Sequence, residues 1–197
     1  MPWNDCVSAG PSSQDPTALG TRMWGEPKLT VARSYRRSMA GTFVQPTSGT
    51  VQLRLMVLPA GMSAAAMTVV TNTTAKTGGT HGWYVVTDSN RMVLAVTADY
   101  TDAATTWGTT YTGYKLPFTG PLQTAYTGVY YAGLMIAATG MPNICSSSTV
   151  SSGLAVAAPT LTATAGTGQT TPPAVGSQLA ALVPLTNAGW YITLQSS

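Results

Sequence analysis

The chain has 197 residues, of which 44% are hydrophobic and only 8% charged, against roughly 25% charged residues in an ordinary soluble domain. Nine basic and six acidic side chains give a formal net charge of +3, too few charges of either sign to build an electrostatic groove for nucleic acid. Polarity comes from Thr, Ser, Gly and Gln instead, which predicts one turn-rich all-β domain. We expect an assembly to cover part of so uncharged a surface.

The sequence carries no predicted targeting or membrane-spanning segment. No apolar run is long enough to cross a bilayer, and the first residues lack the basic and apolar regions of a secretory signal. We therefore expect synthesis in a cytoplasm. Cys6 and Cys145 lie far apart in the sequence, which favours two unpaired thiols over a disulfide.

Residues 1–39 differ from the rest of the chain. Four prolines interrupt any regular element, and the segment holds half of the acidic residues and five of the nine basic ones. We predict an extended N-terminal arm whose spaced apolar side chains, including Trp3 and Trp24, make contacts in an assembly. A first strand of the domain at residues 29–35 is an alternative that is compatible with an arm.

The only basic cluster lies near the end of this arm and consists of Arg33, Arg36 and Arg37. Clusters of this size are often solvated without a specific role. The sharper hypothesis is that these three side chains pair with acidic groups on a larger assembly.

A succession of short strands is predicted from residue 40 onward. Residues 50–58 alternate, with Val51, Leu53, Leu55 and Val57 on one face and Thr50, Gln52, Arg54 and Met56 on the other, as expected for a strand with one wet side. Further strands are predicted at residues 67–72, 82–87, 92–97 and 111–116. A turn at residues 88–90 joins the second and third of these into a hairpin.

Residues 129–139 are predicted to form the central strand. The stretch carries no charge, is rich in β-branched and aromatic residues and is framed by Gly128 and by Gly140 and Pro142. Both of its faces are apolar. One face should meet the domain core, and the other needs a second cover, such as a neighbouring subunit or the N-terminal arm.

The C-terminal part adds weak strands at residues 154–158 and 160–165 and a last strand at residues 189–194. About eight short strands without a long helix predict an antiparallel β-sandwich, jelly-roll-like, that spans residues 40–197. A closed barrel is the alternative.

No catalytic constellation is recognisable. His81 is the only histidine, and a triad would have to combine it with a distant thiol and one of Asp88, Asp99 and Asp102, without a nucleophile-elbow motif. The thiols and His81 also lack zinc-ligand spacing. We predict a surface or hydrogen-bonded structural histidine, turn roles for Asp99 and Asp102, and no catalytic residue, metal or cofactor.

Aromatic residues gather around the predicted hairpin and the loop that follows it. Core filling is the ordinary interpretation of such a group. The sharper one is a ledge that stacks a sugar ring, for which Trp107 in the polar loop, together with Tyr111, is the candidate platform.

Three segments taken together resemble a known family. They are residues 49–58 with Val-x-Leu-x-Leu, residues 82–102 with Gly-Trp-Tyr and Val-Leu-Ala-Val-Thr, and residues 128–142 with Gly-Val-Tyr-Tyr-Ala-Gly-Leu-Met. This order is similar to the jelly-roll-like β-domain of minor tail, fibre and head accessory proteins of bacteriophages that infect actinobacteria. The closing Leu182-Val183-Pro184 and Gly189-Trp190-Tyr191 fit the same pattern, and the likeness does not reach the arm.

The resemblance implies a non-enzymatic virion component that is made in the host cytoplasm. We expect a head decoration protein or a small minor tail or fibre protein. It would form a homo-oligomer, most simply a trimer, and attach to major capsid or tail proteins through its arm. A carbohydrate-binding module that recognises host surface glycan is the second hypothesis, and a hydrolase has the least support.

Overall fold

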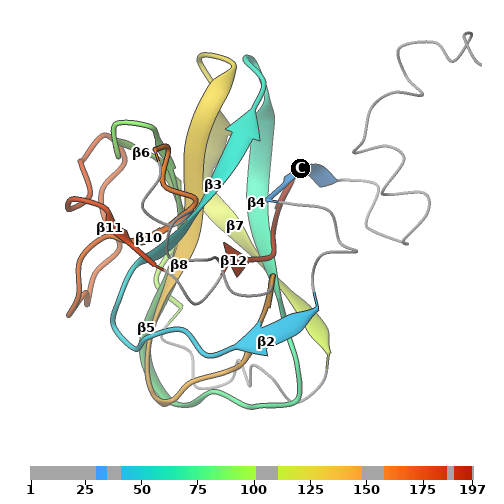
Figure 1. The fold of residues 1–197 in the computed structure, drawn as a ribbon, viewed down its shortest axis with the longest axis vertical. Helices are drawn as coiled ribbons and strands as arrows, with labels where there is room; N and C mark the ends of the chain where they lie inside the picture. The colour runs from blue at the N-terminus through green and yellow to red at the C-terminus, as the bar shows by residue number, and fades with distance from the viewer. Residues whose placement is uncertain (1–29, 35–40, 101–110, 148–157, 186–188, 197) are drawn as a thin grey trace, which may run out of the picture.

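The computed structural model describes residues 30–34, 41–100, 111–147, 158–185 and 189–196. These residues form two antiparallel sheets that pack face to face (Figure 1), so the predicted all-β sandwich is confirmed. Within the described part, no helix is long and apolar enough to cross a membrane.

One sheet has seven strands. Its path runs through β1 (Thr30–Arg33), β13 (Ile192–Gln195), β4 (Ser63–Thr71), β9 (Ile144–Ser147) and β12 (Gly189–Trp190), with β2 (Thr42–Val44) paired to β9 and β7 (Thr112–Gln123) paired to β4. The other sheet has six strands in the order β11 (Val183–Pro184), β10 (Thr162–Thr164), β3 (Gln52–Leu58), β8 (Gly128–Gly140), β5 (Thr77–Asp88) and β6 (Val93–Val96).

The main core lies between the two sheets. The seven-stranded sheet contributes Met67, Trp190 and Leu194, and the six-stranded sheet contributes residues such as Tyr84 and Leu134. At one side the sheets also touch through an isolated bridge between residues 97 and 118.

Strand β8 is central, as predicted. It pairs with β3 on one side and β5 on the other, and residues 130–136 are all buried. Gly133 is required there because a Cβ atom would lie 2.0 Å from the backbone oxygen of Gln52 on the neighbouring strand. Alternate side chains of β8 enter two different cores, with Tyr130 and Leu134 between the sheets and Met135 on the outer side.

The second face of β8 is covered by residues 158–185, which we call the outer segment. Ala165, Leu179 and Leu182 pack over Trp83 and Met135 on the outer side of the six-stranded sheet. Figure 1 shows this segment, around β10 and β11, on the side of the molecule away from β4. The expectation that a neighbouring subunit or the arm supplies this cover is therefore corrected, and this face gives no argument for an assembly.

Backbone hydrogen bonds fix the outer segment beside β3, where they extend the pairing of β3 with β10, and at the β6 edge of the sheet. Val51 N–H donates to the Gly166 carbonyl at 3.2 Å, and Ala165 N–H donates to the Val51 carbonyl at 2.9 Å. At the β6 edge, Val93 N–H donates to the Ser177 carbonyl at 2.8 Å. The outer segment thus adds β10 and β11 to the six-stranded sheet, and the residues between these strands fold back over its outer face.

The two faces predicted for the strand at residues 50–58 are present, since Val51 and Leu53 lie in the outer core and Met56 in the main core, but the wet side was wrongly assigned. Met56 and buried Gln52 belong to the side facing the other sheet, although they were assigned to the wet face. Val57, assigned to the dry face, is 68% exposed. Both sides of this strand are packed along most of its length, so alternation alone cannot say which side is wet.

The alternative first strand is confirmed as β1, which pairs with β13 at the edge of the seven-stranded sheet. The sandwich therefore begins within the stretch that we assigned to the arm. Arm residues 1–29 and 35–39 lie outside the described residues, as does the predicted strand at residues 154–158 except for residue 158.

Strand β7 is longer than the predicted strand at residues 111–116 because it continues past Pro117 and Pro121. Proline has no N–H to donate and is tolerated in a strand at the edge of a sheet. β7 pairs with β4 and follows the margin of the seven-stranded sheet, where its prolines fit.

Candidate functional site

Most of the predicted site residues lie outside the described part of the chain. These are Trp3, Trp24, Arg36, Arg37 and Trp107. Arg33 is described, and it is a half-buried residue of β1 that lies opposite Thr193 of β13.

Tyr111, the described half of the predicted glycan platform, is 71% exposed just before β7. Phe43 of β2 contacts it edge to face, with ring centroids 5.6 Å apart and an interplanar angle of 67°. Such a contact holds the tyrosine ring in place while leaving much of its surface accessible. Sequence reasoning missed Phe43, since nothing in the spacing of residues 43 and 111 signals their proximity.

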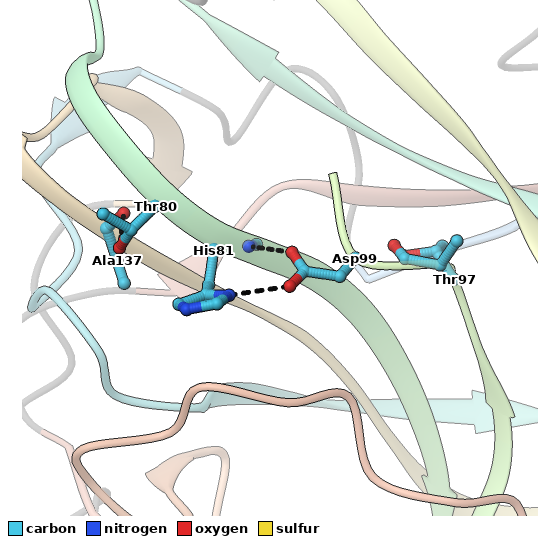
Figure 2. Close-up of polar contacts among 7 residues, drawn as sticks. Thr80, His81, Thr97, Asp99 and Ala137 are labelled. Carbon is cyan, nitrogen blue, oxygen red and sulfur yellow. Dashed lines mark hydrogen bonds and ion pairs between the residues drawn. The ribbon is translucent and has the colours of Figure 1, made fainter. Parts of the chain in front are cut away.

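The most organised polar site joins His81 and Asp99 (Figure 2). His81 Nδ1 lies 2.7 Å from Asp99 Oδ2, and the other carboxylate oxygen, Oδ1, accepts the Gly82 N–H at 2.9 Å. Both side chains are partly exposed. The carboxylate thus binds a side chain and the backbone of the same strand, β5.

This contact continues the pairing of β5 and β6 beyond the end of β6. Thr97 N–H donates to the Tyr84 carbonyl at 3.0 Å, and Tyr100 N–H donates to the Gly82 carbonyl at 2.9 Å. Between these two bonds, the Asp99 carboxylate accepts the Gly82 N–H in place of a backbone carbonyl. The side chain of Asp99 therefore completes the edge of β5.

Gly82 is also needed to seat Tyr100. A Cβ atom at position 82 would lie 2.4 Å from the Tyr100 ring, so the ring rests directly on the glycine. Tyr84 contacts the same ring edge to face at 6.0 Å, and Lys76 Nζ lies 5.2 Å from its centroid in a cation–π arrangement.

The two packed tyrosines remain neutral over a wide pH range. Burial disfavours the phenolate and raises the pKa of Tyr84 well above its ordinary value. Burial likewise raises the pKa of Tyr100, and the neighbouring Asp99 carboxylate raises it further. Neither phenol is suited to act as a general base near neutral pH.

Neighbouring hydroxyl groups are engaged with the backbone. Thr97 Oγ1 accepts the Tyr84 N–H and donates to the Ala98 carbonyl, and Thr80 Oγ1 donates to the Ala137 carbonyl. Figure 2 shows both threonines beside the pair, without a dashed contact to His81. Cys145, the described thiol, lies in β9 of the other sheet. The described groups therefore do not assemble into a nucleophile–histidine–aspartate triad.

Metal chemistry has no support in the described residues either, since they contain no group of three or more His, Cys, Asp and Glu side chains that could hold an ion. The hydrogen bond predicted for His81 is confirmed, and its structural role stays a prediction. Asp99, which we assigned to turn chemistry, is the partner that sequence reasoning missed. The observed register of Val85 with Val96 places Gly82 opposite Asp99, but a β-bulge between Val86 and Thr87 shifts the pairing, so the turn alone does not predict this contact.

No protein-family model, curated protein or solved structure matches the chain. A function for the chain is therefore inferred from its residues and their arrangement.

Proposed function

We propose that this protein is a non-enzymatic structural component of a bacteriophage particle. It is either a head decoration protein or a small minor tail or fibre protein, made in the host cytoplasm and incorporated into the virion. Its N-terminal segment attaches to a major capsid or tail protein, and its β-sandwich is displayed on the particle surface.

One observation carries the proposal. The three main segments that resemble the phage β-domain form β3, β8, β5 and β6, which are four consecutive neighbours in the six-stranded sheet, whereas the closing Gly189-Trp190 forms β12 of the other sheet. Widely separated motifs thus meet in one structural unit, around Leu53, Gly133 and Val85. This supports treating the resemblance as a likeness of a domain, because chance matches of short apolar motifs need not be adjacent.

The polar chemistry is compatible with a structural role. Asp99 completes a strand edge, and Asp88 Oδ1 accepts the N–H groups of Asn90 and Met92 to close the β5–β6 turn. Thr124, in the turn between β7 and β8, bonds in a similar way to the backbone of the turn between β3 and β4. Its hydroxyl donates to the Pro59 carbonyl at 2.6 Å and accepts the Met62 N–H at 2.8 Å. These groups stabilise the backbone and leave little for catalysis.

Self-association is part of the proposal. Virion proteins of this kind act in symmetric multiple copies, and a trimer is the simplest arrangement for a fibre or a local threefold site. Since the outer segment already covers β8, the subunit contacts must lie elsewhere.

Particle fractionation tests the proposal. Phage particles from the source system are purified on a density gradient, and the protein is quantified by mass spectrometry and immunogold labelling. We expect a fixed copy number per particle and label on intact virions. Absence of the protein from infectious particles would rule the proposal out, and a copy number divisible by three would support the trimer.

A host-glycan-binding module is the second candidate. It is favoured because the Tyr111 ring is exposed to solvent and is held by its contact with Phe43. A glycan array and cell-wall polysaccharide from the host would be probed with the full chain. We expect binding to fall for Tyr111→Ala and for Trp107→Ala, and to persist for Val183→Ala, an exposed residue of β11. No binding by the unmodified protein, or equal binding by all variants, would eliminate this candidate.

A further inference from the structure

The outer face of the seven-stranded sheet, the face turned away from the main core, carries an ordered line of polar side chains. Arg33 of β1 lies opposite Thr193 of β13, Thr193 opposite Thr68 of β4, and Thr68 opposite Lys115 of β7. The four residues cross four neighbouring strands in one straight register. We call them the polar row.

Side chains in and beside the polar row are buried although none of the described strands lies across this face. Thr193 is 6% exposed and Thr68 is 9% exposed. In the adjacent row, Thr30 is 6% and Gln195 is 4% exposed. Threonine and glutamine on a bare sheet face would be wet. These are the exposures of a single chain, so part of the chain outside the described residues belongs on this face.

Two hydroxyl groups on this face point to the same conclusion. Thr30 Oγ1 and Thr68 Oγ1 are both inaccessible and have no hydrogen-bond partner within the described part of the chain. A buried hydroxyl without a partner is unfavourable by about 1–3 kcal/mol. A covering segment that supplies polar groups would satisfy them.

Charge favours residues 1–29 as the covering segment, because their three acidic side chains outnumber their two basic ones, Arg22 and Lys28. Arg33 and Lys115 stand at the two ends of the polar row, and the described aspartates belong to the region around the β5–β6 hairpin of the other sheet. Residues 1–29 contain Asp5, Asp15 and Glu26, half of the acidic residues of the chain. Their carboxylates complement a face whose described charges are both positive.

We propose that residues 1–29 dock across the polar row of their own sheet, with acidic side chains directed to Arg33 and Lys115. The segment leads directly into Thr30, which already lies on this face, so docking requires no long connection. Twenty-nine residues can extend much farther than the roughly 15 Å across four strands. This inference concerns the chain alone and does not depend on the virion proposal. The side of the docked segment that faces away from the sheet would remain available to contact a capsid or tail protein.

Thiol labelling tests the cover. In a Cys6→Ser background, Thr68→Cys places a thiol on the covered face, and Ala125→Cys places a matched thiol on the exposed turn between β7 and β8. We expect a maleimide to label Thr68→Cys at least about tenfold more slowly than Ala125→Cys, because labelling requires the cover to open. Equal rates, with circular dichroism showing both variants folded, would overturn the proposal.

Neutralising the acidic side chains tests the identity of the cover. Adding Asp5→Asn, Asp15→Asn and Glu26→Gln to the Thr68→Cys protein should raise its labelling rate several-fold, in line with the modest strength of exposed ion pairs. The labelling rate of Ala125→Cys should not change. Protection of Thr68→Cys that is unaffected by these substitutions would assign the cover to another segment or molecule.

Carbodiimide cross-linking of the unmodified full chain distinguishes its own segment from that of a neighbouring copy. An equal mixture of unlabelled and nitrogen-15-labelled protein is cross-linked and digested. We expect Lys115 to couple to Asp5, Asp15 or Glu26 in peptide pairs of a single isotope. Mixed-isotope pairs, coupling only to Asp102 or to the C-terminal carboxylate, or no coupling of Lys115 would each overturn the proposal.

Discussion

His81 and Asp99 form a contact of 2.7 Å that closes the end of a hairpin whose strands have already ceased to pair regularly. The same carboxylate accepts the Gly82 N–H at 2.9 Å. Asp99 therefore contributes two bonds to β5, whereas His81 contributes one of them. Because of this difference, replacing each residue in turn should change the stability of the fold by a different amount.

Replacing Asp99 should cost more stability than replacing His81. Asp99→Ala leaves both the imidazole and the Gly82 N–H without their acceptor, and we expect the free energy of unfolding to fall by about 1–3 kcal/mol. His81→Ala keeps the bond to Gly82 and should lower it by about 0.5–1 kcal/mol. Urea denaturation followed by fluorescence measures both. A larger loss for His81→Ala would contradict the role assigned to Asp99.

Alkaline pH should destabilise the fold through Tyr84 and Tyr100, whose pKa values burial raises in the folded state. Above about pH 10, tyrosines of the unfolded chain lose their protons while these two keep theirs. The folded state then binds more protons, so the free energy of unfolding falls as pH rises from the unfolded toward the folded pKa, and the full contribution is present below about pH 10.

Urea denaturation at a series of pH values from neutral to strongly alkaline measures this effect. Tyr84→Phe serves as the test variant because it removes one of the two buried phenols, at the expense of its 3.2 Å bond to the Tyr114 carbonyl. Its stability should decline less steeply with pH than that of the unmodified protein. An identical decline would show that other groups are responsible.

Gly133→Ala should disrupt the centre of the six-stranded sheet. A Cβ atom would lie 2.0 Å from the Gln52 backbone oxygen, and neither β8 nor β3 can move without disturbing both cores. We expect a loss of about 3 kcal/mol or more. Gly120→Ala is the matched control, since a Cβ atom there meets nothing within 4 Å. Thermal unfolding compares the two, and similar melting temperatures would refute the close approach.

The sequence predicted those elements whose ends are set by residues close together in the chain. Glycine and proline mark the ends of β8 so clearly that the prediction of residues 129–139 falls within the observed Gly128–Gly140. The β5–β6 hairpin was equally recognisable from its Asp-Ser-Asn turn. In these elements, turn residues and β-branched runs act within a few positions of one another.

Relationships between distant segments could not be predicted in the same way. The outer segment has no clear periodicity, so nothing in its sequence indicated that Leu179 would cover the second apolar face of β8. Similarly, Tyr111 and Phe43 meet only because β7 and β2 belong to the same sheet. The register of Gly82 with Asp99 is an intermediate case, since it follows from the pair of Val85 and Val96 but not from that of Thr87 and Val93, which lies beyond a β-bulge.

Leu179→Ala tests whether the outer segment truly replaces a neighbouring subunit as the cover of β8. Leu179 is buried in the outer core with Trp83, and truncating a buried leucine typically costs about 2–4 kcal/mol of stability. Tryptophan emission should shift to the red as Trp83 becomes more accessible. Val175→Ala, at an exposed position of the same segment, should change stability by less than about 0.5 kcal/mol. If Leu179→Ala changed the stability of the isolated chain as little as Val175→Ala, the outer segment would not effectively cover β8. The apolar outer face of β8 would then again require a partner molecule.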